Sequence, residues 1–174
     1  MQKEKKDFKV TPWEVKGEVD YERLVKEFGL EKISDSLLNR IKKHTKELHF
    51  MLRRGIFFAH RDLSWLLDEY EKRNKFFLYT GRGPSGPIHL GHIYPWIFTK
   101  WLQDVFNAEL WFHFPDEEKF LFKNISYEDT QRHLKENMLD VIALGFDPKK
   151  THFIIDTVHA NLLYKEAVKV AKKI

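Results

Sequence analysis

One segment, residues 76–102, constrains the fold of this chain more than any other. It starts with the continuous apolar run 76–80, which is typical of a parallel strand buried on both faces. A loop of Gly, Pro and Ser follows, and then an apolar-periodic helix whose first turn carries His89 and His92. Because N–H groups at a helix start are unpaired and the helix dipole is positive there, this turn predicts a polyphosphate site with two imidazoles on one face.

The loop in this segment follows neither of the common glycine-rich phosphate motifs. Gly81, Gly83 and Gly86 match the dinucleotide fingerprint G-x-G-x-x-G only formally. Pro84 and Pro87 remove two N–H donors that a pyrophosphate would need, and a Walker A motif is absent. The loop and the H-x-G-H run that follows it are therefore interpreted as a different kind of phosphate site.

After residue 73, strands and helices are expected to alternate. Each expected strand is a short apolar run, and each expected helix has apolar residues at helical spacing. The order is strand 76–80, helix 89–106, strand 110–114, helix 126–145, strand 152–155 and helix 162–174. Such connections give a parallel sheet, and three strands make half of a doubly wound fold. Because half a fold leaves one wall of the ligand crevice unbuilt, we expect either a truncated segment of a longer protein or completion by another chain.

Residues 1–73 have a different pattern and are expected to form a small, mainly helical extension. Asp20 and the Ser-Asp pair at 34–35 are placed to cap two helices, and a leucine stripe from Leu63 predicts a third. The predicted fold class is therefore α/β. The first half of a doubly wound, Rossmann-like parallel sheet, 74–174, follows this N-terminal extension.

Composition excludes several classes of site and location. The chain has no cysteine, which rules out a disulfide framework, a thiolate zinc site and a Cys nucleophile. Lys plus Arg is 30 against 26 for Asp plus Glu, a mild excess that permits an RNA partner without arguing for one. Residues 1–9 are charged and lack the apolar core of a signal peptide, and residues 11–19 fit a short hairpin or an extended arm. A cytoplasmic protein with no membrane partner is expected.

The residues around the two histidines carry a resemblance to a known family. The run HLGH at 89–92 resembles the HIGH signature of class I aminoacyl-tRNA synthetases. Longer runs resemble tryptophanyl-tRNA synthetases of the archaeal and eukaryotic type, over nearly the whole chain from about residue 10. These runs are 11–13, 53–62, 79–85, 98–103 and 116–120.

The resemblance implies a two-step ligase reaction. The carboxylate of tryptophan attacks the α-phosphate of ATP, and the activated carbonyl then passes to tRNA(Trp). Catalysis of this kind is positioning plus stabilisation of charge on phosphate oxygens. The resemblance assigns the catalytic roles to His89, His92 and Lys119. It assigns ATP binding, with Mg²⁺ accompanying ATP and no metal site on the chain, to Thr80, Arg82, Gly83, Ser85, His89, Gly91 and His92.

The amino-acid site follows the family pattern with departures. Tyr79 matches the tyrosine that reads the indole N–H, and Glu118 matches the acid that contacts the substrate's ammonium group. His113 stands where the family usually has glutamine, and Pro115 replaces the usual threonine. A neutral histidine can still accept one hydrogen bond, so His113 is kept as an amino-acid-binding residue.

Two function classes remain open on the sequence alone. The first is a tryptophan–tRNA ligase, here as an N-terminal segment that is weak or inactive alone, because the family's second phosphate loop and anticodon domain are absent. Homodimers are implied. The alternative is a non-catalytic, synthetase-like paralogue or module that binds RNA or protein. The kinase-like run at 60–63 carries no weight, because Leu67 stands where a kinase loop needs asparagine.

Overall fold

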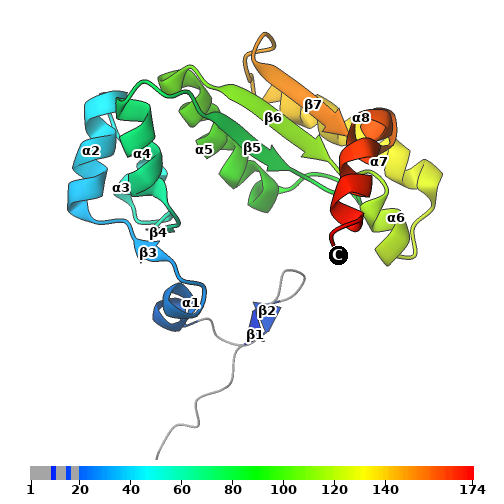
Figure 1. Cartoon of the computed structure of the whole chain (residues 1–174), viewed down its shortest axis with the longest axis horizontal. Coiled ribbons are helices and arrows are strands. Elements are labelled where there is room, and N and C mark those ends of the chain that lie inside the picture. The colour runs from blue at the N-terminus through cyan, green and yellow to red at the C-terminus, as the bar shows by residue number, and fades with distance from the viewer. Residues whose placement is uncertain (1–8, 11–14, 17–19) are drawn as a thin grey trace, which may run out of the picture. The chain divides into compact units, whose positions relative to one another are not determined.

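The computed structural model describes residues 9–10, 15–16 and 20–174 (Figure 1). The chain divides into two compact units, Met1–Asp68 and Glu69–Ile174, and each is described by itself. Most of the hairpin or arm expected at 11–19, and the family-like run 11–13, lie outside the described residues. Among those described, β1 (Lys9–Val10) pairs antiparallel with β2 (Val15–Lys16). The boundary expected between residues 73 and 74 stays a prediction.

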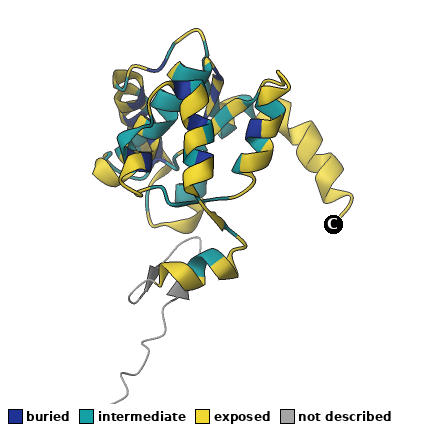
Figure 2. Cartoon of the chain, turned by 90° about the vertical axis from the view of Figure 1, so that its left-hand side faces the viewer, coloured by how far each residue is buried: buried dark blue, intermediate teal, exposed yellow. Residues whose placement is uncertain are grey.

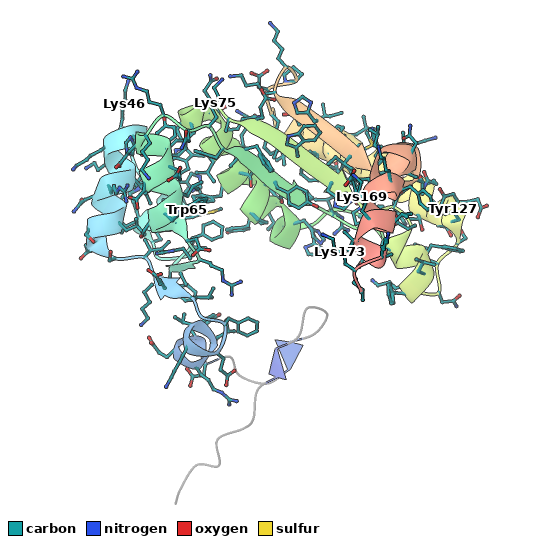
Figure 3. The ribbon with its side chains drawn as sticks, viewed as in Figure 1. Lys46, Trp65, Lys75, Tyr127, Lys169 and Lys173 are labelled. Carbon is teal, nitrogen blue, oxygen red and sulfur yellow. The ribbon has the colours of Figure 1, made fainter. Side chains whose placement is uncertain are left out.

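The first unit is mainly helical. Its further elements are α1 (Tyr21–Glu27), β3 (Glu31–Lys32), α2 (Asp35–Thr45), α3 (Phe50–Arg53), β4 (Ala59–His60) and most of α4 (Leu63–Glu71). As predicted, Asp20 caps α1 and Ser34 caps α2 through their side-chain oxygens. Strands β3 and β4 pair antiparallel. The buried apolar side chains are Leu37, Ile41, Met51, Leu52 and Leu67, whereas Trp65 of α4 stays exposed (Figure 3).

The second unit is built on a three-stranded parallel sheet in the order β5-β6-β7. Its elements are β5 (Phe77–Gly81), α5 (Leu90–Phe106), β6 (Glu109–Phe114), α6 (Glu118–Phe122), α7 (Tyr127–Ala143), β7 (Thr151–Ile155) and α8 (Asp156–Ala171). In Figure 1, β6 lies between its two neighbours. The predicted α/β class and parallel sheet are confirmed, with strand ends within one residue of those expected.

Helices α5 and α7 cover one face of this sheet. The buried core joins Trp96 of α5 and Leu134 and Val141 of α7 to alternate residues of the central strand. These strand residues are Leu110, Phe112 and Phe114, which have no exposed surface. Alternate side chains of a strand lie on opposite faces, so the remaining residues of β6 lie on the other face.

A buried glutamine connects the far end of α5 to β7. Gln103 accepts a hydrogen bond from the Asp147 N–H through Oε1 at 2.9 Å, and donates through Nε2 to Thr151 Oγ1 at 3.0 Å. The Thr151 hydroxyl donates in turn to the Asp147 carbonyl at 2.8 Å. Because hydrogen bonds on both sides of a buried amide stabilise one arrangement, this network sets where β7 begins.

The other face of the sheet is open, which differs from the expectation of strands buried on both faces. Phe77, Tyr79 and Trp111 are 63%, 61% and 38% exposed. Tyr79, Trp111 and His152 lie abreast in the register, and the Trp111 and His152 rings stack with centroids 4.5 Å apart. This face of the sheet is open because α5 and α7 both cover the opposite face. We call the side with Phe77, Tyr79, Trp111, His113 and His152 the open face.

Two helices differ from the sequence prediction. The last helix, α8, begins at Asp156 instead of Leu162, because its polar first turns hide the periodicity. The short helix α6 was not expected. Helix α8 is exposed from residue 160 onward (Figure 2), and Lys169 lies in its last turn with Lys173 just beyond its end (Figure 3). In the described ranges, none of the helices is long and apolar enough to cross a membrane.

Candidate functional site

The predicted site residues lie around the carboxyl ends of β5 and β6, where parallel sheets bind ligands. Gly81 ends β5 in direct contact with β6. A Cβ atom at this position would lie 2.3 Å from the carbonyl oxygen of His113. The next residue, Arg82, donates its backbone N–H to the same carbonyl at 2.9 Å. Glycine is therefore the residue that lets the loop leave the sheet so close to β6.

Arg82 holds the loop together from inside. Its Nε donates to Asn137 Oδ1 at 2.7 Å, and its Nη2 donates to the Gly86 carbonyl at 3.2 Å. Asn137, which is fully buried on α7, donates to the same carbonyl at 3.1 Å. Burial lowers the pKa of Arg82, but a guanidinium remains charged at neutral pH. Arg82 therefore supports the loop that was expected to line the phosphates.

His89 caps the helix that follows the loop. Its Nδ1 accepts the Gly91 N–H at 3.2 Å, so a neutral imidazole carries its proton on Nε2. That Nε2–H is a donor with no hydrogen-bond partner among the described residues, as stabilisation of a phosphate oxygen requires. A Cβ at Gly91 would lie 3.0 Å from the His89 ring, so glycine leaves room for the capping imidazole.

His92 stands behind His89 and is neutral. The two rings have centroids 3.7 Å apart. Burial, and then the charges of Arg82 and His89, lower the pKa of His92 below its ordinary 6.5. Arg82 donates to Nε2 of His92, while the backbone N–H of His89 lies 3.2 Å from Nδ1 of the same ring. Because a neutral imidazole has only one acceptor nitrogen, it can accept a hydrogen bond from only one of these two donors at a time.

Glu118 and Lys119 approach the loop at Gly83. The Lys119 ammonium donates to Glu118 Oε1 at 2.8 Å. A Cβ at Gly83 would lie 2.7 Å from Glu118 Oε2 and 2.8 Å from Lys119 Cε. The missing side chain at Gly83 therefore brings a carboxylate and an ammonium against the loop.

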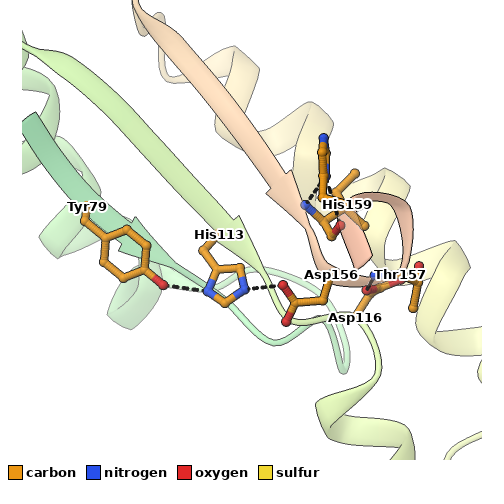
Figure 4. Close-up of polar contacts among 7 residues, drawn as sticks. Tyr79, His113, Asp116, Asp156, Thr157 and His159 are labelled. Carbon is orange, nitrogen blue, oxygen red and sulfur yellow. Dashed lines mark hydrogen bonds and ion pairs between the residues drawn. The ribbon is translucent and has the colours of Figure 1, made fainter. Parts of the chain in front are cut away.

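Tyr79 and His113 meet on the open face (Figure 4). The Tyr79 hydroxyl lies 2.6 Å from His113 Nδ1, and Nε2 of the same ring lies 2.7 Å from Asp156 Oδ1. The histidine that replaces the family's usual glutamine thus bonds on both sides. The two expected amino-acid-binding residues contact each other, and Asp156 joins them.

Asp116 anchors the start of α8 beside this group (Figure 4). It accepts the Thr157 N–H at 3.1 Å, the Thr157 hydroxyl at 2.6 Å and the Gln131 amide at 2.7 Å. The neighbouring Glu117 has a raised pKa, first because of burial and then because of Asp156 and Asp116. Its buried Oε2 has no partner among the described residues.

Two expected residues are less directly engaged. Thr80 alternates with Tyr79 and lies on the covered face of the sheet, and Ser85 lies half-buried in the loop. Sequence reasoning missed Asn137 and Asp156. Signals for both existed, since Asn137 interrupts an apolar stripe and Asp156 directly follows a strand at the edge where ligands bind.

The arrangement can bind a polyanion and an amino acid side by side. The helix start, the Nε2–H of His89 and the Lys119 ammonium offer donors and positive charge near the loop. Glu118 offers a carboxylate next to them for a substrate ammonium group. No three His, Asp or Glu side chains in the described residues converge as metal ligands.

Comparisons with known proteins find curated relatives that match nearly the whole chain. The chain is 51% identical to the tryptophan–tRNA ligase of Pyrococcus furiosus over 170 residues, which are 97% of this chain and 44% of the relative. The ligase of Saccharolobus solfataricus is 49% identical over equal shares. The chain thus spans about half the length of the curated relatives it matches.

Solved structures agree. The tryptophanyl-tRNA synthetase of Plasmodium falciparum has a TM-score of 0.84 at 43% identity, covering 90% of this chain and 44% of the other. No family model matches the chain. Nearly all of this chain is therefore similar to a part of the tryptophanyl-tRNA synthetases that makes up about half of their length.

Proposed function

We propose that the chain is the N-terminal part of a tryptophan–tRNA ligase, which makes Trp-tRNA, AMP and pyrophosphate through Trp-AMP. The observation that carries the proposal is the joint presence of the family's loop, its two histidines and its Glu-Lys pair in one site, at 51% identity to a curated ligase. Residues 1–73 then form the helical extension, and residues 74–174 form the first half of the nucleotide-binding domain.

In this proposal the nucleotide lies over the loop and the start of α5. His89 and His92 stabilise the phosphate oxygens, and Lys119 contributes a positive charge. The ATP site is also lined by Thr80, Gly83, Ser85 and Gly91. Arg82 supports the loop at this site through its side-chain hydrogen bonds. Mg²⁺ arrives bound to the ATP phosphates, as is usual for this ion.

The amino acid lies between the loop and the open face. Glu118 binds its ammonium group, and Tyr79 with His113 binds its side chain. A related synthetase from Encephalitozoon cuniculi, with a TM-score of 0.83 and 39% identity, is described as bound to tryptophan. The further partners in this proposal are tRNA(Trp) and a second copy of the protein, and the location is the cytoplasm.

A chimera tests the ligase proposal. This chain replaces the matching 170 residues of the P. furiosus ligase, and the activity measured is tryptophan-dependent ATP–pyrophosphate exchange. We expect exchange in the chimera and a loss of roughly 100-fold or more in each of His89→Ala and His92→Ala, because each removes stabilisation of developing charge. His133→Ala, which removes a histidine that pairs with Glu136 on α7, is the matched control and should leave the rate unchanged.

The same assay decides against the proposal if the result is negative. A chimera that is folded by circular dichroism, yet exchanges with no amino acid, would remove the ligase assignment. A non-catalytic module that binds RNA or protein would then be the remaining explanation.

A further inference from the structure

Three side chains from three elements form one hydrogen-bonded row across the end of the sheet. Tyr79 belongs to β5, His113 to β6, and Asp156 is the first residue of α8 (Figure 4). The two contacts are 2.6 Å and 2.7 Å long, and the middle ring uses both of its nitrogens. Nothing in the family resemblance assigns a role to Asp156.

The donor and the acceptor of each hydrogen bond in the row follow from the carboxylate of Asp156. An ionised carboxylate only accepts hydrogen bonds, and the first turn of the sixteen-residue α8 favours a negative charge. The proton of a neutral His113 must therefore be on Nε2, which faces Asp156. Its other nitrogen, Nδ1, can then only accept, so the Tyr79 hydroxyl must donate to it.

The oxygen of Tyr79 is the outer end of the row. Once its only proton is committed to His113, this oxygen offers lone pairs alone to anything that lies on the open face. The oxygen will accept a hydrogen bond from a ligand that presents an N–H. With a ligand that presents no donor, the oxygen will stay unpaired. An unpaired polar group at a contact costs binding free energy.

We propose that Asp156 is a positioning residue that holds His113 in the Nε2–H tautomer and thereby makes Tyr79 a selective acceptor for an N–H group of the bound side chain. The inference rests on the proposed function for the identity of that ligand. Tryptophan carries such a group, the indole N–H, as the only polar atom of its side chain.

The row is separate from what holds α8 in place. Thr157 donates two hydrogen bonds to Asp116, which fasten the helix start, and Gln131 of α7 donates a third to Asp116. None of the three involves His113 or Tyr79. The His113 and Asp156 side chains keep 25% and 21% of their surface exposed. Asparagine has the size of aspartate and keeps an oxygen that can accept a hydrogen bond, so Asp156→Asn should alter the row without unfolding the unit.

The position of the proton is measured without any ligand. Long-range ¹⁵N–¹H correlation spectra of the chain report the tautomer of each of its nine histidines, and His113→Gln identifies the signal of His113. We expect His113 as the Nε2–H tautomer, and a mixture of tautomers in Asp156→Asn, whose amide can also donate. The control Asp140→Asn, on the surface of α7, should leave the signal unchanged. An Nδ1–H or doubly protonated His113 in the unaltered chain at pH 7.5 would overturn the proposal.

The selectivity is measured by calorimetric binding of two ligands to the chain and to the chimera. One is tryptophan, and the other is its benzothienyl analogue, in which sulfur replaces the indole N–H. We expect a preference for tryptophan of roughly tenfold or more, falling to about threefold or less in Asp156→Asn. His113→Gln should keep the preference, because a glutamine amide can donate to Asp156 and accept from Tyr79. His113→Leu should lose it.

The outcomes separate this inference from the proposed function. A preference that survives Asp156→Asn in a folded protein contradicts the inference while the ligase proposal stands. Absence of tryptophan binding in every protein removes the proposed function and the selectivity with it, and the spectra still decide whether Asp156 positions His113.

Discussion

At the scale of single residues, Gly81 is the described glycine at which an added Cβ atom would lie closest to another atom. Its added Cβ would meet a carbonyl oxygen of the neighbouring strand, which cannot move without shifting the sheet. We expect Gly81→Ala to lower the free energy of unfolding by about 1–3 kcal/mol, as overpacking does. Urea denaturation followed by circular dichroism measures the change.

Gly86→Ala is the matched control in the same loop. A Cβ there meets nothing within 4 Å, and its φ is not in the left-handed region. This variant should stay within about 0.5 kcal/mol of the unaltered chain. Equal losses in the two variants would show that the close approach of Gly81 to β6 does not determine stability.

At the scale of elements, Asp116 joins the end of β6 to α7 and α8, and its contribution should depend on pH. Burial pushes the pKa of Asp116 up, but hydrogen bonds from Thr157 and Gln131 outweigh it, so the pKa lies below the ordinary 3.8. A group with a depressed folded pKa stabilises above its unfolded pKa and loses that contribution as pH falls through the folded value. Asp116→Asn should cost about 1–3 kcal/mol at pH 7.

The measurement compares the free energy of unfolding of the unaltered chain and Asp116→Asn between pH 7 and pH 2.5. The difference should be constant above about pH 5 and shrink below the ordinary 3.8. Asp140→Asn, on the surface of α7, should show no difference at any pH. A gap between the unaltered chain and Asp116→Asn that is independent of pH would contradict the assigned role.

Also at this scale, the sequence predicted the elements whose signals are local. The strands are apolar runs, and α5 and α7 have caps and a stripe within a few residues of each other. The polar contacts could not be predicted because their partners are remote in sequence: Arg82 and Asn137 are 55 positions apart, and His113 and Asp156 are 43 positions apart. Periodicity shows that a strand is apolar, but it cannot show which of its faces the connecting helices cover.

At the scale of the whole molecule, the open face should make the chain associate with itself at high concentration. Phe77 is 63% exposed there, beside other aromatic rings. We expect Phe77→Ser to raise the dissociation constant of self-association roughly tenfold, because the contact loses a buried aromatic side chain. Sedimentation velocity measures the constant.

Leu139→Ser is the matched control for this prediction. Leu139 is 66% exposed, but it lies on α7, away from the open face. Its substitution should leave the association unchanged. A chain that stays monomeric at millimolar concentration would contradict the prediction, as would equal effects of the two substitutions.

The stacked pair on the open face also gives the molecule an optical reporter. Trp111 is partly in water, and its ring lies 4.5 Å from the imidazole of His152, a group that quenches indole emission when it is protonated. Anything that covers the open face would remove water from Trp111 and move its emission to shorter wavelength. Difference spectra against Trp111→Phe would isolate this signal from the other four tryptophans, so occupancy of the sheet can be followed by light with no label attached.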